Sequence, residues 1–166
     1  MERFRLRLQV ALLAIGTAFA WYTLVDDYRR FFSAGGRVFE WSGCAVTNPL
    51  LTPCFYGALA FLAAFVWALV LLRSALEAVA RRQRGLNWLL AAGTVFAWGD
   101  FAYEMLLYSQ QRSPSAFSCP PPGEPAVHPL MMPCYYGAWI FLAALAVSLW
   151  ILRSRRTAYA GRNGHA

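Results

Sequence analysis

The segment Cys54–Leu72, with the sequence CFYGALAFLAAFVWALVLL, is a run of 19 residues without a charged side chain. About 20 apolar residues in an α-helix cross the ~30 Å hydrocarbon core of a bilayer. Three other segments have a comparable length and composition: Leu8–Val25, Leu86–Tyr108 and Cys134–Leu152. The sequence therefore predicts an all-α integral membrane protein with four transmembrane helices.

The composition of the whole chain agrees with this class. Of the 166 residues, 59% are hydrophobic and only 14% are charged, whereas a soluble domain carries about 25% charged residues. No segment outside the four spans is large enough to bury a soluble core. We expect a single membrane domain over residues 1–166 that ends in a flexible cytoplasmic tail at 157–166.

Two parts of the sequence occur twice. The run NPLLTPCFYGA at 48–58 is matched by HPLMMPCYYGA at 128–138, and LLAIGTAFAW at 12–21 is matched by LLAAGTVFAW at 89–98. Repeat 1 covers approximately 8–74 and repeat 2 approximately 85–154. Because each repeat has two spans, both enter the membrane from the same side. The sequence predicts tandem parallel helical hairpins with pseudo-two-fold symmetry about the membrane normal.

All 15 basic residues are arginine. Eleven form three groups, which are Arg3, Arg5 and Arg7; Arg73, Arg81, Arg82 and Arg84; and Arg153, Arg155, Arg156 and Arg162. Since short cytoplasmic segments retain arginine during insertion, both termini are predicted to be cytoplasmic and the cysteine-bearing loops extracytoplasmic. We expect a multi-pass protein of a bacterial inner (plasma) membrane with its arginines at anionic headgroups. This grouping argues against the nucleic-acid partner that a net charge of +7 would suggest.

The four cysteines occupy matching places in or beside the two outer loops: Cys44, Cys54, Cys119 and Cys134. Extracytoplasmic thiols meet an oxidising compartment, so disulfides are expected. Four cysteines allow three connectivities, and the two-fold relation permits all of them. A hairpin ancestor favours the pairs Cys44–Cys54 and Cys119–Cys134, each of which would stabilise the fold by a few kcal/mol.

Paired cysteines in the outer loops of a small helical bundle also give a second interpretation. The arrangement resembles that of the quinone-linked thiol oxidases in the DsbB and vitamin K epoxide reductase group. This resemblance in architecture implies a thiol–disulfide oxidoreductase. The sequence lacks the Cys-x-x-Cys spacing that normally makes one thiol reactive.

Acidic residues within the spans are candidates for an intramembrane polar site. Asp100 and Glu104 share one face of the third span because they are four residues apart. Asp27 aligns with Glu104 in the repeat, and Thr23 aligns with Asp100. A carboxylate inside a bilayer is costly and marks a site or a buried partner. Asp27 and Glu104 can reach the outer interface, so the deeper Asp100 is the strongest candidate, with a structural or partner-docking role favoured.

His128 is the one histidine outside the tail. Together with Asp100 and Glu104 it would provide ligands that suit several divalent ions. A lone histidine is weak support, so we predict a solvated or loop-bonding residue and no metal site. Haem held by two histidines is excluded because no second histidine lies in a span.

Small residues four positions apart mark where helices approach closely in lipid. Gly16 and Ala20 in the first span occupy the same repeat positions as Gly93 and Ala97 in the third. This pattern predicts that the first and third helices meet near the pseudo-two-fold axis.

The sequence contains no nucleotide-binding, nucleophile-elbow or metalloprotease motif. The leading interpretation is a non-catalytic membrane protein, either an accessory subunit or a small lipid- or partner-binding module. Its partners would be membrane lipids, other membrane subunits or further copies of itself. Aromatic residues near the outer interface suit a bound lipid, quinone or carotenoid as well as an interfacial belt. The alternatives are the thiol–disulfide oxidoreductase and a small transporter or channel lined by Asp100.

Overall fold

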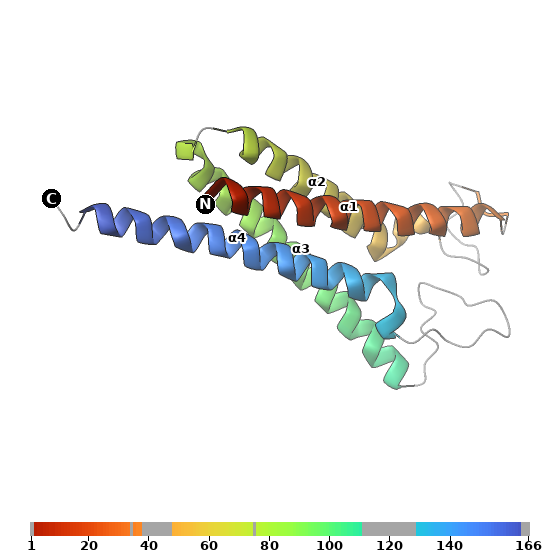
Figure 1. Ribbon diagram of the computed structural model, residues 1–166. Coiled ribbons are helices and arrows are strands. Elements are labelled where there is room, and N and C mark those ends of the chain that lie inside the picture. Colours follow the sequence, from red (N-terminus) through yellow and green to blue (C-terminus); the bar gives the residue numbers. More distant parts are fainter. Residues whose placement is uncertain (1, 34, 38–47, 75, 111–128, 164–166) are drawn as a thin grey trace.

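The structure, a computed structural model, describes residues 2–33, 35–37, 48–74, 76–110 and 129–163. Within these ranges the chain is all-α, as expected (Figure 1). Its four long helices are α1 (Glu2–Ser33), α2 (Pro53–Arg73), α3 (Leu76–Ser109) and α4 (Pro133–Asn163). Helix α4 therefore includes most of the segment for which the sequence predicts a tail.

Three of these helices are long and apolar enough to span a bilayer. The candidate spanning segments are Arg3–Ser33 in α1, Pro53–Arg73 in α2 and Pro133–Ser154 in α4. Helix α3 is longer, with 34 residues, but it is not among the helices that meet this criterion. Asn87 and Asp100 interrupt its apolar segment and lower its average hydropathy.

The second helix of each hairpin begins in the same way. A short 3₁₀ turn, η1 (Pro49–Leu51) or η2 (Pro129–Met131), leads into a helix whose first residue is proline. Proline suits this position because the first N–H of a helix has no intrahelical partner. At η1 the Asn48 Oδ1 atom accepts a hydrogen bond from the Leu50 N–H at 3.1 Å. These turns fix where Cys54 and Cys134 enter their helices.

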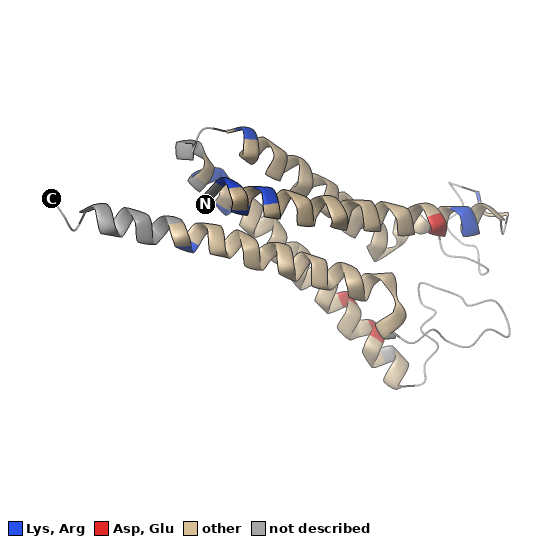
Figure 2. Ribbon diagram, viewed as in Figure 1, with Lys and Arg blue, Asp and Glu red and all other residues tan. Residues whose placement is uncertain are grey.

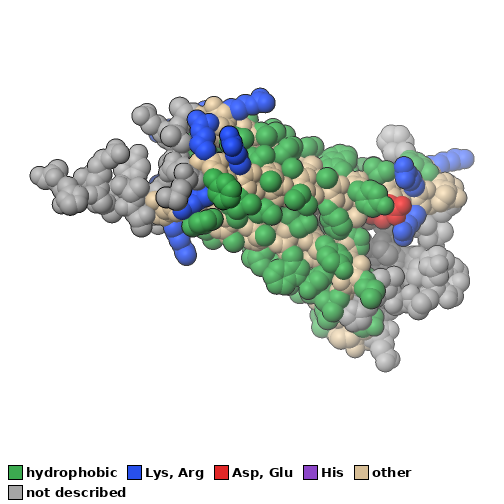
Figure 3. Space-filling model, in the orientation of Figure 1, with side chains coloured by type: hydrophobic (Ala, Val, Ile, Leu, Met, Phe, Trp, Pro, Cys, Tyr) green, Lys and Arg blue, Asp and Glu red, His purple; other side chains and the backbone are tan. Residues whose placement is uncertain are grey.

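The helices form a bundle in which each one packs against two neighbours. Helix α1 contacts α2 and α4, and α3 also contacts α2 and α4, so α1 and α3 lie diagonally opposite. Both termini and the α2–α3 connection lie at one end (Figure 1). Arginines gather at this end, hereafter the basic end (Figure 2). The opposite end, hereafter the loop end, holds the start of α2 and of α4. On the face shown in Figure 3, apolar side chains cover most of the surface between the two ends.

The predicted contact between the first and third helices is wrong. Helices α1 and α3 share no extensive contact, and their glycines make room for phenylalanine rings instead. A Cβ on Gly16 would lie 2.5 Å from Phe61 Cε1, and one on Gly93 would lie 2.7 Å from Phe141 Cε1. The small residues do allow close packing, but their partners belong to α2 and α4.

Phe61 and Phe141 form the centre of the bundle. Their rings stack with centroids 3.8 Å apart and an interplanar angle of 23°, and both are almost completely buried. They belong to the buried hydrophobic core cluster, with Leu13, Leu86 and Leu90 among its members. This stack forms the floor of the space between the helices at the loop end.

Candidate functional site

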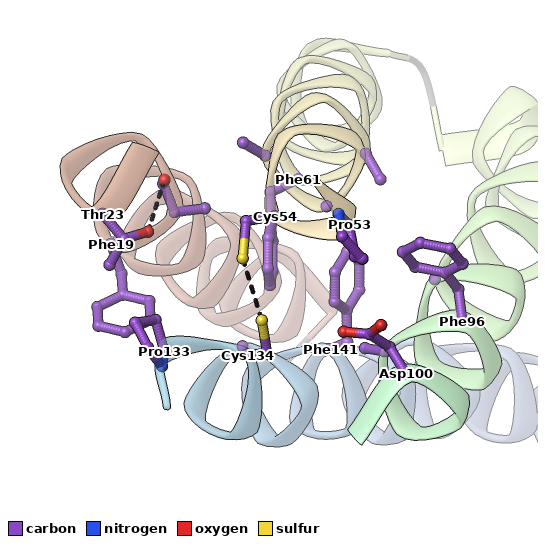
Figure 4. A pocket seen from close by; sticks show the side chains of 17 residues that line it. Phe19, Thr23, Pro53, Cys54, Phe61, Phe96, Asp100, Pro133, Cys134 and Phe141 are labelled. Carbon is purple, nitrogen blue, oxygen red and sulfur yellow. Dashed lines mark hydrogen bonds between the residues drawn. The ribbon is translucent and has the colours of Figure 1, made fainter. Parts of the chain in front are cut away.

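A pocket of about 70 Å³ lies between the four helices on the loop side of the phenylalanine stack. All four helices contribute to it, and its walls are mostly small or aromatic (Figure 4). A volume of about 15 Å³ holds one water, so the pocket has room for a small group or the end of a chain. Its principal lining residues are Phe19, Thr23, Cys54, Gly57, Phe61, Phe96, Asp100, Cys134, Gly137 and Phe141.

Two thiols face each other across this pocket. The Sγ atoms of Cys54 and Cys134 are 3.0 Å apart, and both residues are free cysteines (Figure 4). Each is the second residue of its helix, α2 or α4. The predicted pairs Cys44–Cys54 and Cys119–Cys134 each include a residue outside the described ranges, so they stay predictions. The disulfide pairing favoured from the sequence did not predict this contact between Cys54 and Cys134.

The start of a helix has an electrostatic consequence for this pocket. The unpaired N–H groups of the first turn carry a partial positive charge that stabilises nearby anions. In the pocket this effect comes from two helices, since α2 and α4 both begin there. A carbonyl oxygen of a ligand would be stabilised at this position.

Asp100 and Thr23, which align in the predicted repeat, both line the pocket. The Asp100 carboxylate extends from α3 into the pocket toward Phe141 (Figure 4). No hydrogen bond or ion pair joins it to any other residue that the structure describes. The Thr23 hydroxyl donates to the Ala20 carbonyl oxygen at 2.9 Å. Asp100 therefore supplies a carboxylate, and Thr23 is already satisfied by its own helix.

Two of the other acidic candidates, Asp27 and Glu104, do not line this pocket. Asp27 and Glu104 lie nearer the loop end of α1 and α3, and the Glu104 Oε2 atom is buried without a hydrogen-bond partner in the described part of the chain. His128 lies outside the described residues. Within the described ranges, no group of three or more His, Cys, Asp and Glu side chains is placed to hold a metal ion.

A second polar cluster lies toward the basic end, and the sequence analysis missed it. Gln83 Nε2 donates to Gln9 Oε1 and to Ser148 Oγ, both at 3.0 Å. All three side chains are fully buried, and Gln9 Nε2 and Gln83 Oε1 have no partner among the described residues. The sequence did contain a signal for this cluster, because Gln9 and Gln83 each lie near the basic end of a largely apolar helix. A glutamine side chain buried in lipid requires a hydrogen-bond partner on another helix.

The fold and this site define a four-helix bundle with three helices long and apolar enough to span a membrane, and with an apolar pocket that holds two thiols and one carboxylate. Comparison with protein-family models, with curated proteins and with solved structures finds no match to this chain. The function must therefore be argued from the site itself.

Proposed function

We propose that this protein is a non-catalytic membrane module whose pocket binds the polar end of a hydrophobic ligand of the lipid or quinone class. The observation that carries the proposal is the pocket between the four helices, with apolar walls and the unpaired Asp100 carboxylate. Binding sites for such ligands are mainly apolar, with a few polar groups that fix orientation. A purely structural accessory subunit gains nothing from a pocket with an unpaired carboxylate, so this feature favours ligand binding.

The ligand's polar end would meet Asp100 and the two helix N-termini. A protonated Asp100 would donate a hydrogen bond to a carbonyl or ether oxygen, and an ionised one would accept from a hydroxyl or amine. The aromatic rings of Phe19, Phe96 and Phe141 would contact the apolar part. A carotenoid without a polar end fits this arrangement less well than a quinone or a lipid.

A glycine in the pocket wall provides the test. Gly57 lines the pocket, and a Cβ added there meets no atom within 4 Å. Gly57→Leu should fill the pocket without disturbing the helices. Gly99→Leu is the matched control, because Gly99 is exposed on α3 and has equally open surroundings. Solvent extraction of each purified variant, followed by mass spectrometry, should recover the ligand from wild type and from Gly99→Leu only. Equal recovery from Gly57→Leu would refute the pocket as the binding site.

The thiol contact favours a second candidate, a quinone-linked thiol–disulfide oxidoreductase. Oxidation of Cys54 and Cys134 to one disulfide releases two protons and two electrons, and a quinone that takes up both becomes a hydroquinone. The support is the 3.0 Å distance between the sulfur atoms inside a pocket of suitable lining. Purified reduced protein mixed with a short-chain benzoquinone would form hydroquinone and a Cys54–Cys134 cross-link, and Cys134→Ser would form neither. Binding without hydroquinone formation would leave the non-catalytic proposal in place.

We further propose that α3 is the fourth transmembrane helix and that the two hairpins are parallel repeats. Pairs of aligned residues support the two-fold relation, because Cys54 contacts Cys134 and Phe61 stacks on Phe141. Helix α3 lies in the bundle beside two helices that are apolar enough to span a bilayer. The concentration of arginine at the basic end supports a cytoplasmic location for that end in a bacterial inner membrane.

A further inference from the structure

An apolar groove, separate from the pocket, runs along the α2 surface toward the basic end. It has a volume of about 750 Å³. Helix α2 contributes a stripe of exposed side chains, and α3 contributes Arg82. The stripe consists of Leu59, Leu62, Val66, Trp67 and Val70. Trp67 also lies against Gly85 of α3, where an added Cβ would be 2.8 Å from its ring, so the tryptophan bridges the two helices.

The dimensions of this groove match one lipid chain. From Leu59 to Val70 the helix rises about 16 Å at 1.5 Å per residue. The hydrocarbon core of a bilayer is roughly 30 Å thick, so one leaflet occupies about half of that depth. A single acyl chain from the leaflet at the basic end would therefore lie along the whole stripe.

The position of Arg82 supplies the charge complementarity. Its Nη1 atom donates to Ser74 Oγ at 3.1 Å, and no carboxylate among the described residues pairs with its guanidinium. Arginine binds phosphate oxygens with two parallel N–H donors and is the usual residue for this purpose. The exposed guanidinium lies at the groove's basic end, where a headgroup phosphate would be.

The second hairpin provides an internal comparison. Val70 stands three residues before Arg73, as Trp150 stands three residues before Arg153. On that face the guanidinium of Arg5 lies 4.2 Å from the centroid of the Trp150 ring. The large Trp150 side chain thus forms a cation–π contact with Arg5 at the place that corresponds to the groove. At Val70 the side chain is small, and Arg82 stays available.

We propose that the groove is a binding site for one anionic phospholipid, with the phosphate on Arg82 and an acyl chain along the α2 stripe. This site does not depend on the pocket or on its ligand. Neutral phospholipids have the same acyl chains but no net negative charge. The site should therefore prefer anionic phospholipids, because Arg82 attracts the negative headgroup.

The full chain, purified in mild detergent, can be tested with mixed vesicles of phosphatidylglycerol and phosphatidylcholine at equal amounts. After re-extraction, native mass spectrometry counts the phospholipids that remain bound. One arginine near an anionic headgroup contributes about 1 kcal/mol, which corresponds to about a fivefold preference. Wild type should retain one bound phosphatidylglycerol, with about this preference over phosphatidylcholine.

Three exposed positions make the test specific. Arg82→Gln should lose the preference, while Val70→Trp should lower the binding of both lipids by filling the groove. Arg84→Gln removes the same charge from the same helix, but Arg84 does not line the groove, so this variant should bind as wild type does. The proposal is overturned if Arg84→Gln and Arg82→Gln lose the preference equally, or if Val70→Trp keeps its lipid.

Discussion

Replacing Gly16 by alanine tests the packing at the centre of the bundle. The added Cβ would lie 2.5 and 2.8 Å from Phe61 Cε1 and Cδ1, and 2.9 Å from Ile140 Cγ2. Real Cβ contacts are longer, so one of these side chains must move. The Phe61 ring is only 2% exposed and stacks on Phe141 at 3.8 Å, so moving it disturbs the packing at the centre of the bundle.

The cost follows from known effects of overpacking. Adding one methyl group to a well-packed core destabilises a protein by about 1–3 kcal/mol. The change from glycine to alanine also favours a helix by up to about 1 kcal/mol. Gly99→Ala makes the same change at an exposed helical position with no atom within 4 Å. The difference in unfolding free energy between the two variants therefore isolates the overpacking, about 1–3 kcal/mol.

Thermal unfolding in a fixed detergent measures this difference. For a chain of this size, 1 kcal/mol corresponds to about 2–4 °C, so Gly16→Ala should unfold roughly 2–12 °C below Gly99→Ala. In a Phe61→Leu background the ring atoms that clash are absent, and Gly16→Ala should lose most of its cost. Equal midpoints for Gly16→Ala and Gly99→Ala would show that α1 does not pack against Phe61 as described.

Further predictions concern the polar residues and the topology. Asp100→Asn should leave the unfolding midpoint unchanged but release the pocket ligand on solvent extraction; a large loss of stability would instead indicate a structural carboxylate. Gln83→Met should change the unfolding free energy by less than about 2 kcal/mol, because interhelical hydrogen bonds in membranes contribute about 0.6 kcal/mol on average and Gln83 Oε1 has no partner among the described residues. In cells, Arg82→Cys should react with an impermeant thiol reagent only after the membrane is opened, whereas Ser115→Cys should react in intact cells. The opposite labelling pattern would reverse the proposed orientation.

Hydropathy alone was enough to predict the helical class. The uncharged run Cys54–Leu72 differs from α2 by one residue at each end, because the proline at 53 suits the first position of a helix. Helix α3 was harder to assign as a span, because Asn87 and Asp100 lower its mean hydropathy. Its position in the bundle is decided by packing against α2 and α4, which hydropathy does not report. The sequence thus indicates a helix there more firmly than it indicates a transmembrane one.

The neighbours of each helix could not be predicted from the same information. Gly16 marks a surface of close approach, but the pattern does not say whether the approaching atoms are backbone or an aromatic ring. The 3.0 Å contact between Cys54 and Cys134 shows the same limit. Alignment of the two halves identifies these residues as equivalent, and only the arrangement of helices shows that they are neighbours.

The proposed repeat also allows each half to serve as a reference for the other. Positions where the halves agree, such as the two cysteines and the two stacked phenylalanines, form the frame of the pocket. Positions where they differ carry the features that need a ligand. Thr23 bonds its own helix, whereas its counterpart Asp100 has no partner among the described residues. Trp150 engages an arginine, whereas its counterpart Val70 leaves one exposed above an open groove. Two identical hairpins would carry each of these features twice. If duplication first produced two such hairpins, later divergence at these positions left one polar group in the pocket and one lipid groove.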